Sequence, residues 1–157
     1  MWALATLGIE PSQHLADDLR LRATGVAGEL TGHGVSSVLW SFATMGESPG
    51  DSLMNALRLR SLDLLAAQRL GGGAQGGVKG VDGFTAQGIS NCIWAYAILG
   101  EVPGETLLVA LSEQARLCEH EFTPQVPSLS DFSSFANGSN ELALQQKHLL
   151  FSSFKHP

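Results

Sequence analysis

The chain has 157 residues, 44% of them hydrophobic, and a formal net charge of −6 at pH 7. This length and composition suit one globular domain and exclude a disordered tail. The acidic balance argues against undirected binding to phosphate, and no apolar run approaches the roughly 18–20 residues that a membrane-spanning helix needs.

The sequence motif at the start of the chain is repeated twice further along. All three copies share a tryptophan, an alanine, a glycine and a proline in the same order. Residues 31–57 and 85–111, which contain the second and third copies, have 12 identities in 27 positions. Such self-similarity is typical of repeat proteins. The copies are WALATLGIEPSQ (2–13), SVLWSFATMGESPGD (37–51) and NCIWAYAILGEVPGE (91–105).

The spacing of the tryptophans gives the length of the repeating unit. The step from Trp2 to Trp40 corresponds to a period of roughly 38 residues, a length typical of helical repeats. The step from Trp40 to Trp94 is longer, and the glycine-rich stretch 71–83 explains the excess. This stretch cannot hold a helix, because glycine loses the most backbone entropy. We predict a flexible loop there, interrupting repeat units at about 2–29, 30–70 and 84–121.

Each unit is predicted to form two helices. Apolar residues recur at intervals of three and four, which places them on one face of a first helix. Gly46 and Gly100 follow this helix and are expected to end it in the left-handed conformation. Pro49 and Pro103 are expected in the first turn of the second helix, where a missing N–H costs nothing.

The second helix of the middle unit also has a start signal, because Ser48 and Asp51 fit a capping box. Trp40 and Trp94 are expected to fill the core of each hairpin. One hairpin cannot bury its apolar face alone, whereas stacked hairpins can. We therefore predict an all-α fold, an α-solenoid of about three 38-residue helical-hairpin repeats over residues 1–125.

The repeated motif also resembles a known family. In the third unit it reads GISN (88–91), WAYA (94–97) and LG (99–100); in the second it reads VSS (35–37), WSFA (40–43) and MG (45–46). Together with the period, these residues resemble the octotricopeptide repeat family and are similar to the repeats of FAST-kinase-like RAP proteins. The resemblance implies a chloroplast or mitochondrial location. It further implies non-catalytic binding of single-stranded RNA in transcript stability, processing or translation.

The pattern fades toward the C-terminus. Phe132 stands one period after Trp94, but Asp131 takes the place of an apolar residue. Residues 126–157 are therefore interpreted as a degenerate repeat, a cap or an unrelated Ser-rich tail, and these alternatives stay open. Because Trp2 already lies inside a unit and the units are few, we expect the chain to be a fragment of a larger array, with any targeting segment upstream.

Polar residues opposite the apolar face of the first helices are candidate RNA contacts. Amides and hydroxyls that differ between otherwise similar repeats are what base-by-base reading requires. A solvated helix face would show the same variation, so that alternative also stays open. The second unit has His33, Ser37, Ser41 and Thr44 there, the third has Gln87, Asn91, Ala95 and Ile98, and the candidates are His33, Ser37, Gln87 and Asn91.

Arginines at repeated positions on the second helices are further candidates. Arg20 and Arg22 recur one period later as Arg58 and Arg60. Guanidinium groups on stacked hairpins could follow a phosphate backbone, which makes Arg22, Arg58 and Arg60 candidate RNA contacts. The third unit has no arginine at these places, and pairing with nearby aspartates is an equally simple interpretation.

No arrangement of residues predicts catalysis. Cys92 and Cys118 lack zinc-ligand spacing, and Cys92 is expected to be a buried free thiol. The glycine-rich stretch lacks the lysine and hydroxyl spacing of a phosphate-binding loop. We therefore predict no enzyme activity, metal, cofactor or small-molecule substrate. A protein–protein scaffold is the alternative to RNA binding, because α-solenoids also bind proteins and the acidic charge suits such partners.

Overall fold

The computed structural model describes residues 1–71 and 83–118, and all regular structure in these ranges is helical. The all-α prediction is confirmed. Residues 72–82 of the predicted loop and the whole of 126–157 lie outside the described residues. No helix in the described ranges is long and apolar enough to cross a membrane. The elements are α1 (Trp2–Leu7), α2 (Gln13–Val26), the 3-10 helix η1 (Ala27–Glu29), α3 (Gly32–Met45), α4 (Asp51–Gly71), α5 (Ala86–Leu99) and α6 (Glu105–Leu117).

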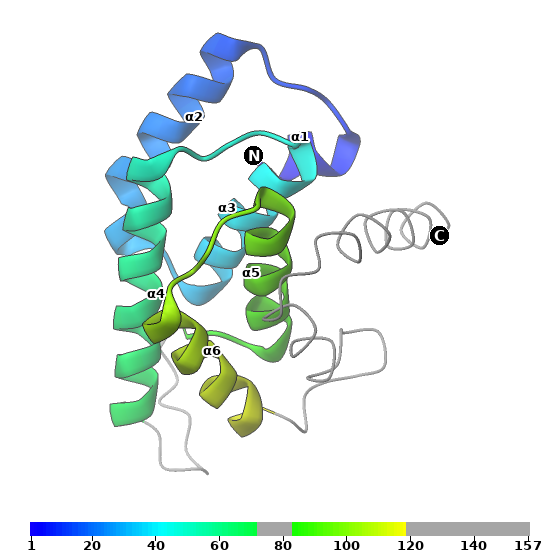
Figure 1. Cartoon of the computed structure of the whole chain (residues 1–157). Helices are drawn as coiled ribbons and strands as arrows, with labels where there is room; N and C mark the ends of the chain where they lie inside the picture. The colour runs from blue at the N-terminus through cyan, green and yellow to red at the C-terminus, as the bar shows by residue number, and fades with distance from the viewer. Residues whose placement is uncertain (72–82, 119–157) are drawn as a thin grey trace.

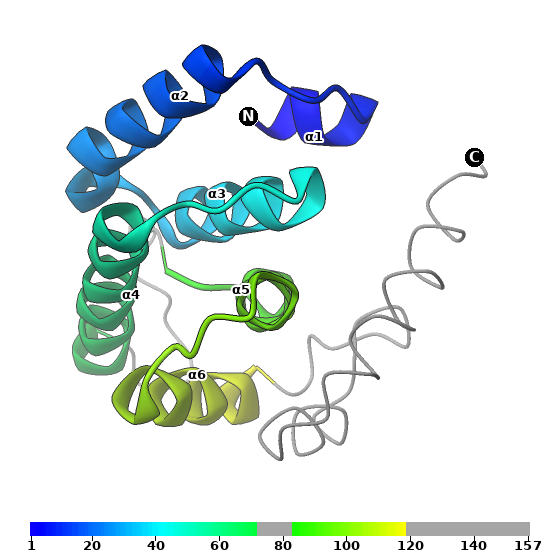
Figure 2. The same ribbon diagram turned by 45° about the horizontal axis from the view of Figure 1, so that its top comes forward.

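The helices lie in two rows, which are seen from two directions in Figure 1 and Figure 2. The outer row consists of α2, α4 and α6, and the inner row of α1, α3 and α5. Within the inner row α3 packs against both α1 and α5, and within the outer row α4 packs against both α2 and α6. Consecutive helices therefore alternate between the rows along the chain.

The helices α3 and α5 begin and end in the same way. Each begins after a threonine whose hydroxyl accepts a hydrogen bond from the N–H three residues later, at 3.0 Å for Thr31 and 3.1 Å for Thr85. This bond satisfies an N–H that has no partner inside the helix. Each helix ends at a left-handed glycine, with φ of 70° at Gly46 and 71° at Gly100. The predicted helix ends are confirmed.

The second helix of each pair begins later than predicted. Because α4 starts at Asp51 and α6 at Glu105, Pro49 and Pro103 precede these helices and do not lie in their first turns. The expected position of the two prolines is therefore wrong. Both prolines instead lie in the connection that leads from the inner to the outer row.

A glycine with positive φ stands directly before each of these helices. Gly50 has φ of 76° and Gly104 has φ of 83°, a conformation that other residues rarely adopt. The Ser48 hydroxyl accepts from the Gly50 N–H at 3.2 Å, so the predicted capping box with Asp51 is wrong. The chain turns at the glycine, and the helix begins only after that turn.

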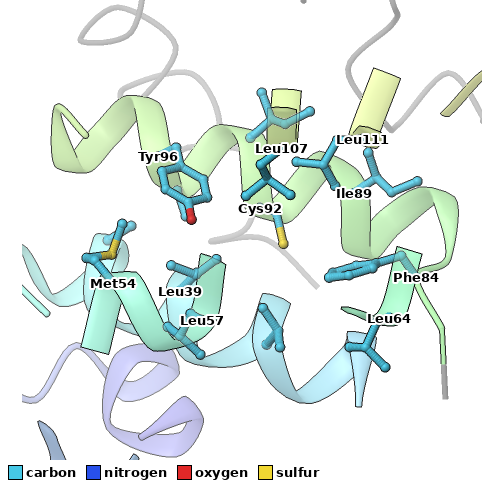
Figure 3. Close-up of a cluster of buried hydrophobic side chains, with 14 of the residues drawn as sticks. Leu39, Met54, Leu57, Leu64, Phe84, Ile89, Cys92, Tyr96, Leu107 and Leu111 are labelled. Atoms are coloured by element: carbon cyan, nitrogen blue, oxygen red, sulfur yellow. The ribbon is translucent and has the colours of Figure 1, made fainter. Parts of the chain in front are cut away.

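The core lies between the two rows. Figure 3 shows part of this core, to which Leu39 of α3, Leu57 of α4 and Ile89 and Cys92 of α5 belong, and all four are at most 1% exposed. Each large aliphatic side chain buried in this way contributes about 1.5–3 kcal/mol to folding. The prediction that Cys92 is a buried free thiol is confirmed. Further fully buried side chains are Val35, Phe42, Leu53, Leu65, Phe84, Leu107 and Leu111.

The tryptophans lie outside the fully buried core. Trp2 is 61% exposed, and Trp40 and Trp94 are half-buried. On α3 the inward direction is taken by Leu39 and Phe42, which are almost completely buried. A helical turn of 3.6 residues then leaves Trp40 at the edge of the buried face. Trp40 and Trp94 were expected to fill the hairpin core; the structure buries both only in part, and Trp94 packs against that core.

Candidate nucleic-acid interface

One face of α3 and α5 is turned away from the outer row. The buried residues Val35 and Phe42 point toward the core, and residues on the opposite side of the same helix are exposed or half-buried. The corresponding positions of α5, in the next repeat, follow the same pattern. We call this surface the inner face; it consists of His33, Ser37, Trp40 and Thr44 on α3 and Gln87, Asn91, Trp94 and Ile98 on α5.

All four polar candidates from the first helices belong to the inner face. His33 and Gln87 are exposed, and Ser37 and Asn91 are half-buried one turn further along. The Ser37 hydroxyl lies 3.5 Å from the His33 ring nitrogen Nε2, which is too long for a strong hydrogen bond. Within residues 1–71 and 83–118 this weak contact is the hydrogen bond that the His33 and Ser37 side chains share, and none is seen for the Gln87 and Asn91 amides.

Two residues of the predicted polar stripe are buried. Ser41 and Ala95 are both 0% exposed, and the Ser41 hydroxyl donates to the Ser37 carbonyl at 2.6 Å. Their expected place opposite the apolar face is wrong. Ser41 and Ala95 lie eight residues after His33 and Gln87, and with 3.6 residues per turn a residue eight positions on lies further round the helix than one seven positions on. Trp40 and Trp94, seven residues beyond the exposed His33 and Gln87, continue the inner face instead.

The inner row contains no charged side chain of the carboxylate, ammonium or guanidinium type. No Asp, Glu, Lys or Arg occurs in α1, α3 or α5. Each outer helix contains both acidic and basic residues. The inner face therefore offers hydroxyl, amide, imidazole and indole groups. A ligand can bind there through hydrogen bonds and stacking, but the inner helices supply no lysine, arginine or carboxylate for a salt bridge to it.

The three candidate arginines lie on the outer row. Arg22 of α2 is exposed. Arg58 of α4 donates to the Asn55 side-chain oxygen at 2.8 Å, and Arg60 of α4 donates to the Leu30 carbonyl at 2.7 Å. These arginines therefore lie on other helices than the polar candidates, and two of them have contacts within the chain.

Arg20 connects the two rows, a role that the sequence did not reveal. Its guanidinium lies 2.6 Å from the Glu47 carboxylate and 2.7 Å from Asp17, and its Nε donates to the Ser48 carbonyl at 2.6 Å. It also lies over the Phe42 ring, 5.9 Å from the ring centroid. Arg20 thus fixes α2 to the connection after α3. No local motif indicates a contact between residues 27 positions apart.

Several buried polar groups are left without a hydrogen bond. In the described part of the chain these atoms are Thr44 Oγ1, Ser90 Oγ, Trp94 Nε1 and the Tyr96 hydroxyl. Burial raises the pKa of Tyr96 well above its usual value, with a further rise from nearby Cys92, and burial also raises the pKa of Cys92. Both shifts favour the protonated, uncharged forms of the two side chains.

Within residues 1–71 and 83–118, no three His, Cys, Asp or Glu side chains come close enough together to hold a metal ion. No family model, curated protein or solved structure matches the chain.

Proposed function

We propose that the chain is part of an α-solenoid of 38-residue helical hairpins that binds single-stranded RNA along its inner face without catalysing a reaction. The observation that supports this most is how α3 and α5 differ. At buried positions one apolar residue replaces another, as at Val35 and Ile89. At inner-face positions the side-chain chemistry changes: the His33 imidazole of α3 corresponds to the Gln87 amide of α5, and the Ser37 hydroxyl corresponds to the Asn91 amide. Such variation on a constant scaffold is what reading different bases requires.

In this proposal the bases face the inner helices and the phosphates face solvent. The inner helices have no lysine or arginine to neutralise phosphate, so affinity comes from base edges and base stacking. They also lack carboxylates, although the whole chain has a net charge of −6. The absence of carboxylates there avoids direct repulsion of an RNA strand.

The same absence of cations favours a second candidate, a protein–protein scaffold. Nucleic-acid binding usually draws much of its affinity from Lys and Arg contacts to phosphate, and the candidate arginines of this chain lie on the outer row. A neutral surface with half-buried tryptophans would also suit an apolar segment of a protein. The organellar setting of the RNA proposal comes from the family resemblance alone.

A binding titration tests the proposal. We expect short random-sequence RNA to bind, and we expect the affinity to change little between about 50 and 200 mM salt, because few counterions are released. Asn91→Ala should weaken binding by about 1–3 kcal/mol for RNAs with the preferred base at one position. The matched control is Arg22→Ala on the outer row, which should have no effect. A lack of RNA binding, or a larger effect of Arg22→Ala, would contradict the proposed interface.

A further inference from the structure

All three helices of the inner row carry a tryptophan at the same position of the repeated motif. These are Trp2 on α1, Trp40 on α3 and Trp94 on α5. None of the three is fully buried, whereas Leu39 beside Trp40 is 0% exposed. The half-buried indoles of Trp40 and Trp94 therefore leave part of their surface available to a ligand, and Trp2 leaves more.

The tryptophans are constant where their neighbours on the inner face vary. Trp40 and Trp94 lie in equivalent places, while the polar side chains one turn before them differ between serine and asparagine. Constant aromatic surface beside variable polar groups suits a ligand whose units share a flat face but differ at their edges. Unpaired nucleobases have this chemistry.

The orientation of the Trp94 indole supports stacking rather than hydrogen bonding. Its Nε1 atom is buried and has no hydrogen-bond partner in the described residues, although the side chain as a whole is only half-buried. The part of Trp94 that reaches solvent therefore does not include its N–H donor. Base–aromatic stacking uses the face of the ring and not this donor.

We propose that Trp40 and Trp94, with Trp2 as a third member, are stacking platforms for successive unpaired bases of RNA, one base per repeat. This inference rests on the proposed RNA-binding function and assigns it new contact residues. Neighbouring helices pack at about 8–10 Å, so each base can stack on one indole while polar side chains of the same helix contact its edge. The carboxylate-free inner helices are electrostatically compatible with an RNA strand at this place.

Substitution of the tryptophans tests this assignment with short oligouridylate and oligoadenylate as probes. Trp40→Leu and Trp94→Leu keep an apolar side chain but remove the aromatic ring, and each should lower the affinity for both probes by about 5- to 150-fold. Trp40→Phe and Trp94→Phe should keep most of the affinity. Thermal unfolding of each variant separates lost stacking from lost folding.

Photocrosslinking gives a second measurement that needs no variant. RNA that contains 5-iodouridine should crosslink to the wild-type chain at Trp40 and Trp94, as mapped by mass spectrometry. If RNA binds but crosslinks elsewhere, or if folded Trp40→Leu binds as well as wild type, the stacking assignment is wrong and RNA binding itself stands. If neither oligonucleotide binds the wild-type chain at all, both the assignment and the RNA-binding proposal are wrong.

Discussion

The helices α3 and α5 are two versions of one element, and they differ in a consistent way. Both have 14 residues, begin after a threonine cap and end at a left-handed glycine. At core positions one apolar residue replaces another of similar size, as from Val35 to Ile89 or from Leu39 to Ile93. At the inner face the substitutions change the chemistry, as from Thr44 to Ile98. Packing thus restricts one side of the helix and leaves the other side free to differ.

The largest expected change in stability comes from a substitution on the buried side of α3. Leu39→Ala should lower the free energy of unfolding by about 2–5 kcal/mol, because Leu39 is 0% exposed and its removal leaves a cavity between the rows. Chemical denaturation measures this change. The matched control is Leu21→Ala on the outer row, where Leu21 is 72% exposed and the change should stay within about 0.5 kcal/mol. Equal effects of the two variants would contradict the assigned core.

The helices α3 and α5 also differ at their first residue, which is Gly32 in α3 and Ala86 in α5. A Cβ atom on Gly32 would meet the backbone of Gly83 and lie 2.8 Å from the Phe84 nitrogen. Gly32→Ala should therefore destabilise the chain by about 1–3 kcal/mol through overpacking. Gly25→Ala, with no atom within 4 Å of its added Cβ, should instead stabilise α2 by about 0.5–1 kcal/mol. Thermal unfolding of both variants shows whether the signs are opposite.

The two helix ends should respond alike to substitution. Gly46→Ala and Gly100→Ala should each cost about 1–2 kcal/mol, because alanine is strained in the left-handed conformation and no atom crowds either site. The measurement is the difference in unfolding free energy between each variant and wild type. A cost at only one of the two glycines would show that the helix ends are not equivalent.

The smallest effect on stability is expected at the inner face. His33→Gln and Ser37→Asn should each change the unfolding free energy by no more than about 0.5 kcal/mol, since neither side chain has a strong contact. Thr44→Ile should be neutral or stabilising, because it removes a buried hydroxyl oxygen that has no partner. A loss above about 2 kcal/mol at any of these three positions would indicate a packing role and contradict a free inner face.

The spacing of apolar residues and the glycines Gly46 and Gly100 were enough to predict the helices, the ends of α3 and α5 and the burial of Cys92. These features depend on local periodicity and on glycine's access to positive φ. The start of α4 was misplaced because Gly50, not Pro49, makes the turn. Local sequence does not distinguish these two possibilities, since both residues favour turns.

The candidate site was predicted only in part, and the reason is geometric. His33 and Ser37 were found because they continue a helical stripe, but the next member is Trp40 and not Ser41. Which of these two neighbours is covered depends on the packing of adjacent helices, and helical periodicity alone does not determine it. The contacts of Arg20 also join distant parts of the chain, so no local pattern could indicate that it stabilises the fold.

The most direct test of RNA reading by the inner face is to give α3 the inner face of α5. The triple variant His33→Gln, Ser37→Asn, Thr44→Ile makes this exchange while leaving Trp40 and the core unchanged. Wild type and variant are each used to select RNAs from a random pool, which is then sequenced. The account predicts that the base preference changes at one position of the selected RNA, the position read by α3. At that position the variant should prefer the base that wild type prefers at the adjacent position, which α5 reads. Unchanged preferences in the folded variant, or no selection by wild type, would contradict it.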